Sequence, residues 1–187
     1  MNLKTILDEY FLIANELFRQ NFLNIGLGSL SLKIKADQML INKKNKHYLE
    51  EDFIKNVHIL HENMAWEEAS EDVKIHAEIY KLHSNTKAIA HIFPPNTMTF
   101  AEIHHLFLNP LDFTGKKYLN KIPIIEIGNI KEWEENKEFI IAKNLTENNI
   151  VIIKGFGVFI KTRDIREIIK LAAVMENSAF ILLNSHH

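Results

Sequence analysis

The stretch Lys87–Pro95 holds the residues with the clearest chemical potential in this chain. Its sequence, KAIAHIFPP, is typical of a short buried strand that ends at two prolines. Side chains alternate along a strand, so His91 and Phe93 are expected to point to the same side. A second histidine at position 93 would complete a pair of metal ligands, but phenylalanine binds no metal. Whether the protein is an enzyme or the remnant of one depends on this difference.

A second group of chemically capable residues precedes the predicted helix over 71–83. Asp72 and His76 are four residues apart and are therefore expected to share one helix face. A carboxylate and an imidazole can perform general acid–base chemistry there, or they can form a structural ion pair or cap. Ser70 is a candidate N-cap, and Glu71 suits the positive end of the helix dipole.

Hydrophobic periodicity and turn residues predict the elements that position these side chains. The predicted helices are 3–22, 71–83, 96–108, 132–145 and 164–183, and the predicted strands are 29–34, 38–41, 58–61, 88–93, 123–127, 149–153 and 158–161. The strand 29–34 alternates leucine or isoleucine with serine or lysine, the period-2 pattern of a half-buried strand. Strands and helices mix without repeats or a linker, which predicts an α/β domain with a mixed central sheet flanked by helices.

Composition excludes several classes of protein. The chain has 187 residues, 47% of them hydrophobic and 25% charged, and a net charge of -2, which argues against nucleic acid as a partner. The sequence contains no run of about 20 apolar residues, so no membrane span is predicted. Cysteine is absent, which fits a cytoplasmic location and excludes thiolate chemistry. The closing His186-His187 is either native or the remnant of a tag.

The order and spacing of the motifs resemble the class II aldolase/adducin family over nearly the whole chain. Members carry a Gly-Asn-Ser/Val-Ser turn, a phosphate loop, a Ser-Ser-Glu triplet followed by a histidine, a His-x-His-Pro strand, an Ile-Pro strand and a Leu-x-Asn-His-Gly turn. The matching positions here are Gly28–Ser31, Met39–Asn45, Ser70–Asp72 with His76, His91–Pro94, Ile122–Ile125 and Ile153–Gly157. The resemblance implies a single aldolase/adducin-like domain over residues 1–187.

The resemblance also implies a zinc site, of which only one ligand position is retained. Active members hold Zn²⁺ with three histidines, and the matching positions here are His91, Phe93 and Phe156. A catalytic zinc site normally has three protein ligands, so we expect no metal cofactor. We expect Phe93 and Phe156 to fill the space of the metal, and full burial of a phenylalanine contributes roughly 1.5–3 kcal/mol.

The ligand-binding positions that the resemblance implies are altered as well. They are Ser29, Asn42, Lys43, Ser70 and Glu71. Ser29 keeps a hydroxyl donor, whereas Glu71 would repel a phosphate ~4 Å away by roughly 1–4 kcal/mol. Lys43 or Lys44 could offset that repulsion, although the loop has lost its glycine. Simpler readings are a first-turn helix charge for Glu71, a hairpin serine for Ser29 and a solvated loop over 42–46.

Three functions compete. The first is a non-catalytic binding or assembly member of the family. The second is a metal-independent or altered-metal aldolase or epimerase that acts on a small sugar or sugar phosphate, with Asp72 at the family's acid/base position and His91 beside it. The third is a true aldolase with ligands from unexpected residues. The resemblance further implies a homo-oligomer, most simply a tetramer. Separately, the residues His83, His104 and His105 could form a different metal site with Glu102.

Overall fold

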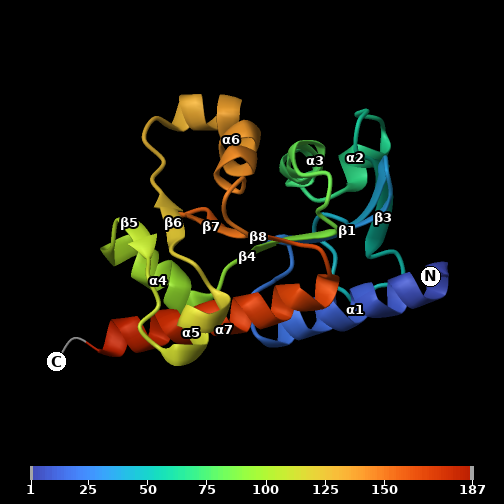
Figure 1. The fold of residues 1–187 in the computed structure, drawn as a ribbon. Coiled ribbons are helices and arrows are strands. Elements are labelled where there is room, and N and C mark those ends of the chain that lie inside the picture. The colour runs from blue at the N-terminus through green and yellow to red at the C-terminus, as the bar shows by residue number, and fades with distance from the viewer. Residues whose placement is uncertain (1, 186–187) are drawn as a thin grey trace.

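The computed structural model describes residues 2–185, in which helices pack on both faces of one mixed sheet (Figure 1). The elements are α1 (Leu3–Arg19), β1 (Ser29–Lys35), β2 (Gln38–Asn42), β3 (Ile54–His58), α2 (Ala65–Glu68), α3 (Val73–Leu82), β4 (Ala88–Ile92), α4 (Pro95–Ile103), β5 (Leu106–Leu108), α5 (Phe113–Tyr118), β6 (Ile122–Ile125), α6 (Ile130–Asn144), β7 (Ile150–Ile153), β8 (Gly157–Thr162) and α7 (Ile165–Asn184). The predicted α/β class with a mixed, helix-flanked sheet is confirmed. His186 and His187 lie outside the described residues.

The strand order separates two layers of helices. It runs β3-β2-β1-β4-β8-β7-β6-β5; β6 and β7 pair in parallel, and the other neighbours pair antiparallel. Helices α3 and α6, with the short α2, cover one face, whereas α1, α4, α5 and α7 cover the other (Figure 1). Each face has its own apolar core. None of the helices within residues 2–185 is long and apolar enough to cross a bilayer.

Strand β1 faces both cores, and its serine side is buried where the sequence predicted exposure to solvent. Leu30 and Leu32 pack into the core under α1 and α7. Ser29 and Ser31 point to the other face, where both are fully buried beneath α3. The prediction of a half-buried strand is therefore wrong, because α3 covers the serine face and satisfies its hydroxyls with side chains.

Several predicted boundaries also differ from the structure, and three of them affect the site or the sheet edges. The strand predicted over 58–61 is β3 and ends at His58. The helix predicted over 96–108 ends at Ile103, because the chain turns extended and residues 106–108 form β5, which pairs with β6. The third is the helix predicted over 71–83, which begins at Val73. Ser70 precedes it and accepts a hydrogen bond from the Asp72 amide at 3.3 Å.

Candidate functional site

A cavity of about 320 Å³ opens where β4 ends and β1 begins. Its lining includes Asp72 and Ser70 from the start of α3, His91 and Phe93 from the end of β4, and Phe156 from the β7–β8 turn. The volume lies at the lower end of the range for small-molecule sites. The fold thus brings together five sequence-predicted positions that lie far apart along the chain.

His91 lies at the inner wall of this cavity and uses both ring nitrogens. It is 3% exposed. Nδ1 lies 2.8 Å from Asp72 Oδ2, and Nε2 lies 2.8 Å from the backbone carbonyl oxygen of Phe156. A carbonyl oxygen only accepts, so Nε2 carries a proton and donates it. His91 therefore presents no lone pair to the cavity.

Two glycines allow the backbone to lie close to His91. At Gly157, with φ +127°, an added Cβ would overlap His91 Nε2 and lie 2.8 Å from its Cδ2. At Gly28, with φ +83°, an added Cβ would lie 2.5 Å from the His91 carbonyl oxygen. Both φ values lie in the region that favours glycine. The glycine of the β7–β8 turn thus serves the contact between His91 and the Phe156 carbonyl.

Asp72 joins this histidine to the serine face of β1. Its Oδ2 accepts hydrogen bonds from Ser29 Oγ at 2.7 Å and from His91 Nδ1 at 2.8 Å. Burial by itself would raise the pKa of Asp72, but the positive charge and hydrogen bond of His91 outweigh it and hold that pKa well below its ordinary value. Asp72 is therefore a carboxylate at neutral pH.

The hydrogen bonds continue from Ser29 into the core. Because the Ser29 hydroxyl donates to Asp72, it accepts from His76 Nε2 at 2.9 Å. Neutral His76 then accepts at Nδ1 from the Ser31 hydroxyl at 2.7 Å, and Ser31 lies 2.9 Å from the Tyr80 hydroxyl. Burial lowers the pKa of His76 to about 3 despite the nearby Asp72 charge. The expected Asp72–His76 ion pair is thus wrong: Ser29 links the two residues, and His76 is neutral.

The ring positions do not fit zinc. Phe93 and Phe156 both pack on His91, with ring centroids 4.8 and 5.1 Å from that of the imidazole. Both rings remain half-buried, so their burial stabilises the fold by less than the full value expected from the sequence. Neither supplies a ligand atom, and both nitrogens of His91 already have partners. The donors needed for a metal with three protein ligands are not present at this position.

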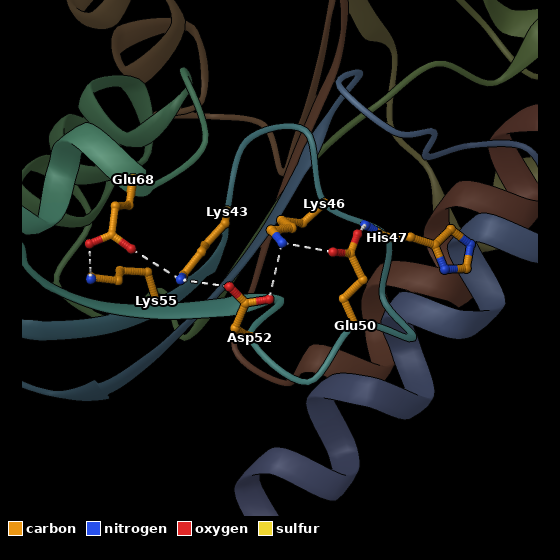
Figure 2. A network of polar contacts seen from close by, with 7 residues as sticks. All are labelled: Lys43, Lys46, His47, Glu50, Asp52, Lys55 and Glu68. Atoms are coloured by element: carbon orange, nitrogen blue, oxygen red, sulfur yellow. Dashed lines mark hydrogen bonds and ion pairs between the residues drawn. The ribbon is translucent and has the colours of Figure 1, made fainter.

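A network of ion pairs occupies the position where the sequence predicted a phosphate loop. Figure 2 shows Lys43 between two carboxylates, 3.2 Å from Asp52 Oδ2 and 3.0 Å from Glu68 Oε2. The same acids also bind Lys46 and Lys55. The hydrogen bonds to Glu68 and Asp52 raise the pKa of Lys43. Lys43 lines the cavity, but its charge is already compensated by the protein.

The other predicted ligand positions divide into two groups. Ser29 is fully buried and is not among the residues that line the cavity, so its contact with a ligand stays a prediction. Asn42 lines the cavity, but its Oδ1 accepts from the Leu30 amide at 2.8 Å, which fixes the start of β1. Ser70 and exposed Glu71 line the cavity as well.

Two cavity lysines complete the lining. Lys44 stands on the β2–β3 loop, where the sequence predicted it as a counter-charge. Lys137 on α6 was missed, because nothing in its spacing links it to the other residues. Its Nζ lies 2.5 Å from Glu134 Oε2 and 5.9 Å from the centre of the Phe156 ring. Only the packing of α6 over the β7–β8 turn brings it to the cavity.

The alternative metal site does not assemble. His83 Nε2 bonds to the Ala142 carbonyl oxygen at 2.8 Å, His105 bonds to Glu126, and His104 stacks on Phe100. Within residues 2–185, no group of three or more metal-ligating side chains comes together. The proposed cluster with Glu102 is therefore wrong.

Comparison with known proteins identifies a family and several solved structures that this chain resembles. The sequence model described as Class II Aldolase and Adducin N-terminal domain matches residues 9–183. Among solved structures, L-fuculose-1-phosphate aldolase from Thermus thermophilus is similar with a TM-score of 0.86 and 24% identity over 98% of this chain and 96% of that chain. A sugar-phosphate aldolase from Thermotoga maritima gives 0.79 and 17% over 97% and 94%. No curated protein sequence matches.

Proposed function

This chain belongs to the class II aldolase and adducin family, and from that premise we propose that it is a binding member without zinc-dependent aldolase chemistry. One observation carries the proposal. His91 has its Nε2 hydrogen-bonded to the Phe156 carbonyl oxygen, while Phe93 and Phe156 occupy the remaining ligand positions. A metal at this place would find no lone pair on His91 and two hydrocarbon rings beside it.

The cavity chemistry favours a small polar ligand such as a sugar or sugar phosphate. Ser70 and Glu71 offer a hydroxyl and a carboxylate for hydroxyl groups, and Lys44 offers a cation, with a second from Lys137, which is also paired with Glu134. The ring of Phe156 gives an apolar surface on which a sugar ring can stack. A volume of about 320 Å³ limits the ligand to a small molecule.

The properties of Asp72 count against catalysis at this cavity. An efficient general base has a pKa near the working pH. The charge and hydrogen bond of His91 instead hold the pKa of Asp72 far below that range, after outweighing the opposite effect of burial. Asp72 is thus a weak base whose oxygen Oδ2 already accepts two hydrogen bonds.

A second candidate function is a metal-independent or altered-metal aldolase or epimerase. The observation in its favour is that the Asp72 carboxylate and the His91 imidazole lie 2.8 Å apart at the wall of a ligand-sized cavity. Such a pair can exchange a proton with a substrate. In this reading Asp72 removes the proton and His91 returns it.

We expect untagged protein to hold no stoichiometric zinc and to cleave neither fuculose phosphate nor rhamnulose phosphate. Loss of a metal Lewis acid removes several kcal/mol of transition-state stabilisation, and each ~1.4 kcal/mol is about tenfold in rate. Elemental analysis and a coupled aldolase assay, with and without added Zn²⁺, measure both properties.

The assay separates the two candidate functions. Cleavage that needs a metal and one zinc per chain would contradict the binding proposal. Metal-independent turnover abolished by Asp72→Asn would establish the second candidate instead. Lys4→Gln, on the opposite face of the sheet, serves as the matched control, because it alters surface charge without touching the cavity.

We also expect a homo-oligomer, a tetramer, which light scattering at micromolar concentration will test. Apolar side chains are exposed on β5 and at the start of α5: Leu106 is 70% and Phe113 81% exposed. Leu108, the last residue of β5, is fully buried. A monomeric mass would contradict the expectation. A cytoplasmic location stays a prediction.

A further inference from the structure

Four cationic side chains, Lys33, Lys87, Lys161 and Arg163, gather at the end of the sheet opposite the Asp72–His91 cavity. Strand pairing brings them together. The Lys33 amide donates to the Lys87 carbonyl oxygen at 2.7 Å, and the Lys87 amide donates to the Thr162 carbonyl oxygen at 2.8 Å. Lys87 precedes β4 and His91 lies near its end, four residues or roughly 13 Å away along the strand. We call these four residues the basic cluster.

The three lysines of the basic cluster lie on one face of the sheet. Residues two apart on a strand point to the same side. Lys33 follows Ser31, which contacts Tyr80 of α3, and Lys161 follows Phe159, which packs in the core beneath α3 and α6. Lys87 is two residues before Ile89 of the same core and continues this alternation, so the three lysines project toward the α3 side, around the loop that joins α3 to β4. Arg163 follows directly after the end of β8.

The charges of the basic cluster have no acidic partner. None of the ion pairs found within residues 2–185 includes any of its four members. Burial, and then the charge of Arg163, lower the pKa of Lys161. Burial, and then the charge of Lys87, lower the pKa of Lys33. By contrast, each lysine of the network in Figure 2 is held by a carboxylate.

A polar cavity of about 530 Å³ lies directly against this cluster. Lys161 and Arg163 line it, together with Ser84 and Asn85 from the α3–β4 loop and Asn149 before β7. Lys161 Nζ reaches Asn149 Oδ1 at 3.4 Å, which orients the ammonium in the cavity wall.

The balance of charge around this cavity is positive. Glu167 is the acidic residue in its lining. Lys33 Nζ donates to the Ser84 carbonyl oxygen at 3.2 Å and so adds a cation directly behind the loop. Lys161, Arg163 and Lys33 against one carboxylate leave the cavity with an excess of positive charge.

We propose that this second cavity binds a small phosphate-bearing anion, held by Arg163 and Lys161. The guanidinium fork binds phosphate oxygens in pairs, and the ammonium adds a point charge. The Ser84 and Asn85 side chains supply neutral donors for the remaining oxygens. The cavity is too small for a polymer, and the net charge of -2 gives the rest of the chain no attraction for nucleic acid. This site is independent of the proposed function, because it shares no residue with the Asp72–His91 cavity.

Titration of the full chain with inorganic pyrophosphate, followed by calorimetry and by amide NMR shifts, tests the proposal. The wild type should bind one pyrophosphate saturably, with the largest shifts at residues 84–86 and 161–163. The variant Lys161→Gln/Arg163→Gln should bind at least tenfold more weakly. Pyrophosphate should also raise the melting temperature of the wild type and leave that of the double variant unchanged, because a ligand stabilises the state that binds it.

Two matched variants distinguish a built site from general attraction. Lys4→Gln removes a surface charge from α1 on the opposite face and should leave the affinity unchanged. Lys44→Gln/Lys137→Gln removes two cations from the Asp72–His91 cavity and should also leave it unchanged. The proposal is overturned by binding that does not saturate, by equal weakening in Lys4→Gln, or by loss of binding in Lys44→Gln/Lys137→Gln.

Discussion

Acidification from pH 6.5 to pH 4.5 is expected to lower the free energy of unfolding by about 2 kcal/mol through His76. Its pKa in the fold is about 3, because full burial beside the ring of Phe159 disfavours its charge by more than the nearby Asp72 carboxylate favours it. In the unfolded chain a histidine titrates near 6.5. Between these two values the unfolded state binds a proton that the folded state does not, so stability falls as the pH falls.

Chemical denaturation at several pH values between 7.5 and 4.5 measures this slope. The variant His76→Gln, whose amide can donate to Ser29 and accept from Ser31, should show a flatter slope by about 1 kcal/mol per pH unit. Asp72 acts in the same direction only below about pH 4, because its pKa in the fold lies below its unfolded value. Measurement above pH 4.5 therefore keeps the contribution of Asp72 small, and the difference from His76→Gln gives that of the histidine.

An exposed histidine provides the matched control. His61→Gln removes one imidazole from the surface, and its slope should equal that of the wild type. Equal slopes for the wild type and His76→Gln would show that the fold does not lower the pKa of His76, so that the residue carries a proton below about pH 6.5. That outcome would reverse the hydrogen-bond directions assigned from Asp72 through Ser29 to Ser31.

Replacement of Gly157 by alanine is expected to destabilise the protein by about 3 kcal/mol. A non-glycine residue at φ +127° carries on the order of 1–3 kcal/mol of backbone strain. The new Cβ would also overlap His91 Nε2 and displace it from the Phe156 carbonyl oxygen. Loss of a buried hydrogen bond to a charged group adds roughly 1.5–3 kcal/mol.

Gly128→Ala is the control for this change. An added Cβ at Gly128 meets no atom within 4 Å, and its φ is not positive, so the variant should stay within about 0.5 kcal/mol of the wild type. Urea denaturation gives both values. In Gly157→Ala, the imidazole N–H of His91 should also exchange faster with solvent by NMR. A Gly157→Ala variant as stable as Gly128→Ala would contradict the assigned role of the turn.

Most of the fold was predicted from local sequence pattern. The α/β class follows from periodicity and turn residues, because a side chain's face depends only on its neighbours along the chain. The prediction was wrong where contact with an element distant in the sequence determines the local structure. Residues 106–108 form a strand because β6 lies beside them, and a leucine-rich stretch does not reveal whether it will pair or coil.

By itself, the sequence determined which atoms are available for chemistry. It located His91 and Asp72 at one site and placed phenylalanine at positions 93 and 156, and residue identity alone excludes those rings as metal ligands. The assignment to the family rests on the same order of motifs, and the match over residues 9–183 confirms it.

Only the tertiary structure decided how those atoms are used. The partner of His91 Nε2 is a backbone carbonyl oxygen 65 residues away, and every residue type carries such an oxygen. The serines of β1 face a buried network rather than solvent, because α3 packs over them. The charge of Lys43 is compensated by two carboxylates, whereas the ion pairs within residues 2–185 include no member of the basic cluster. The residue types alone do not show this difference. Charge compensation depends on the distance between side chains, and the strand order sets that distance.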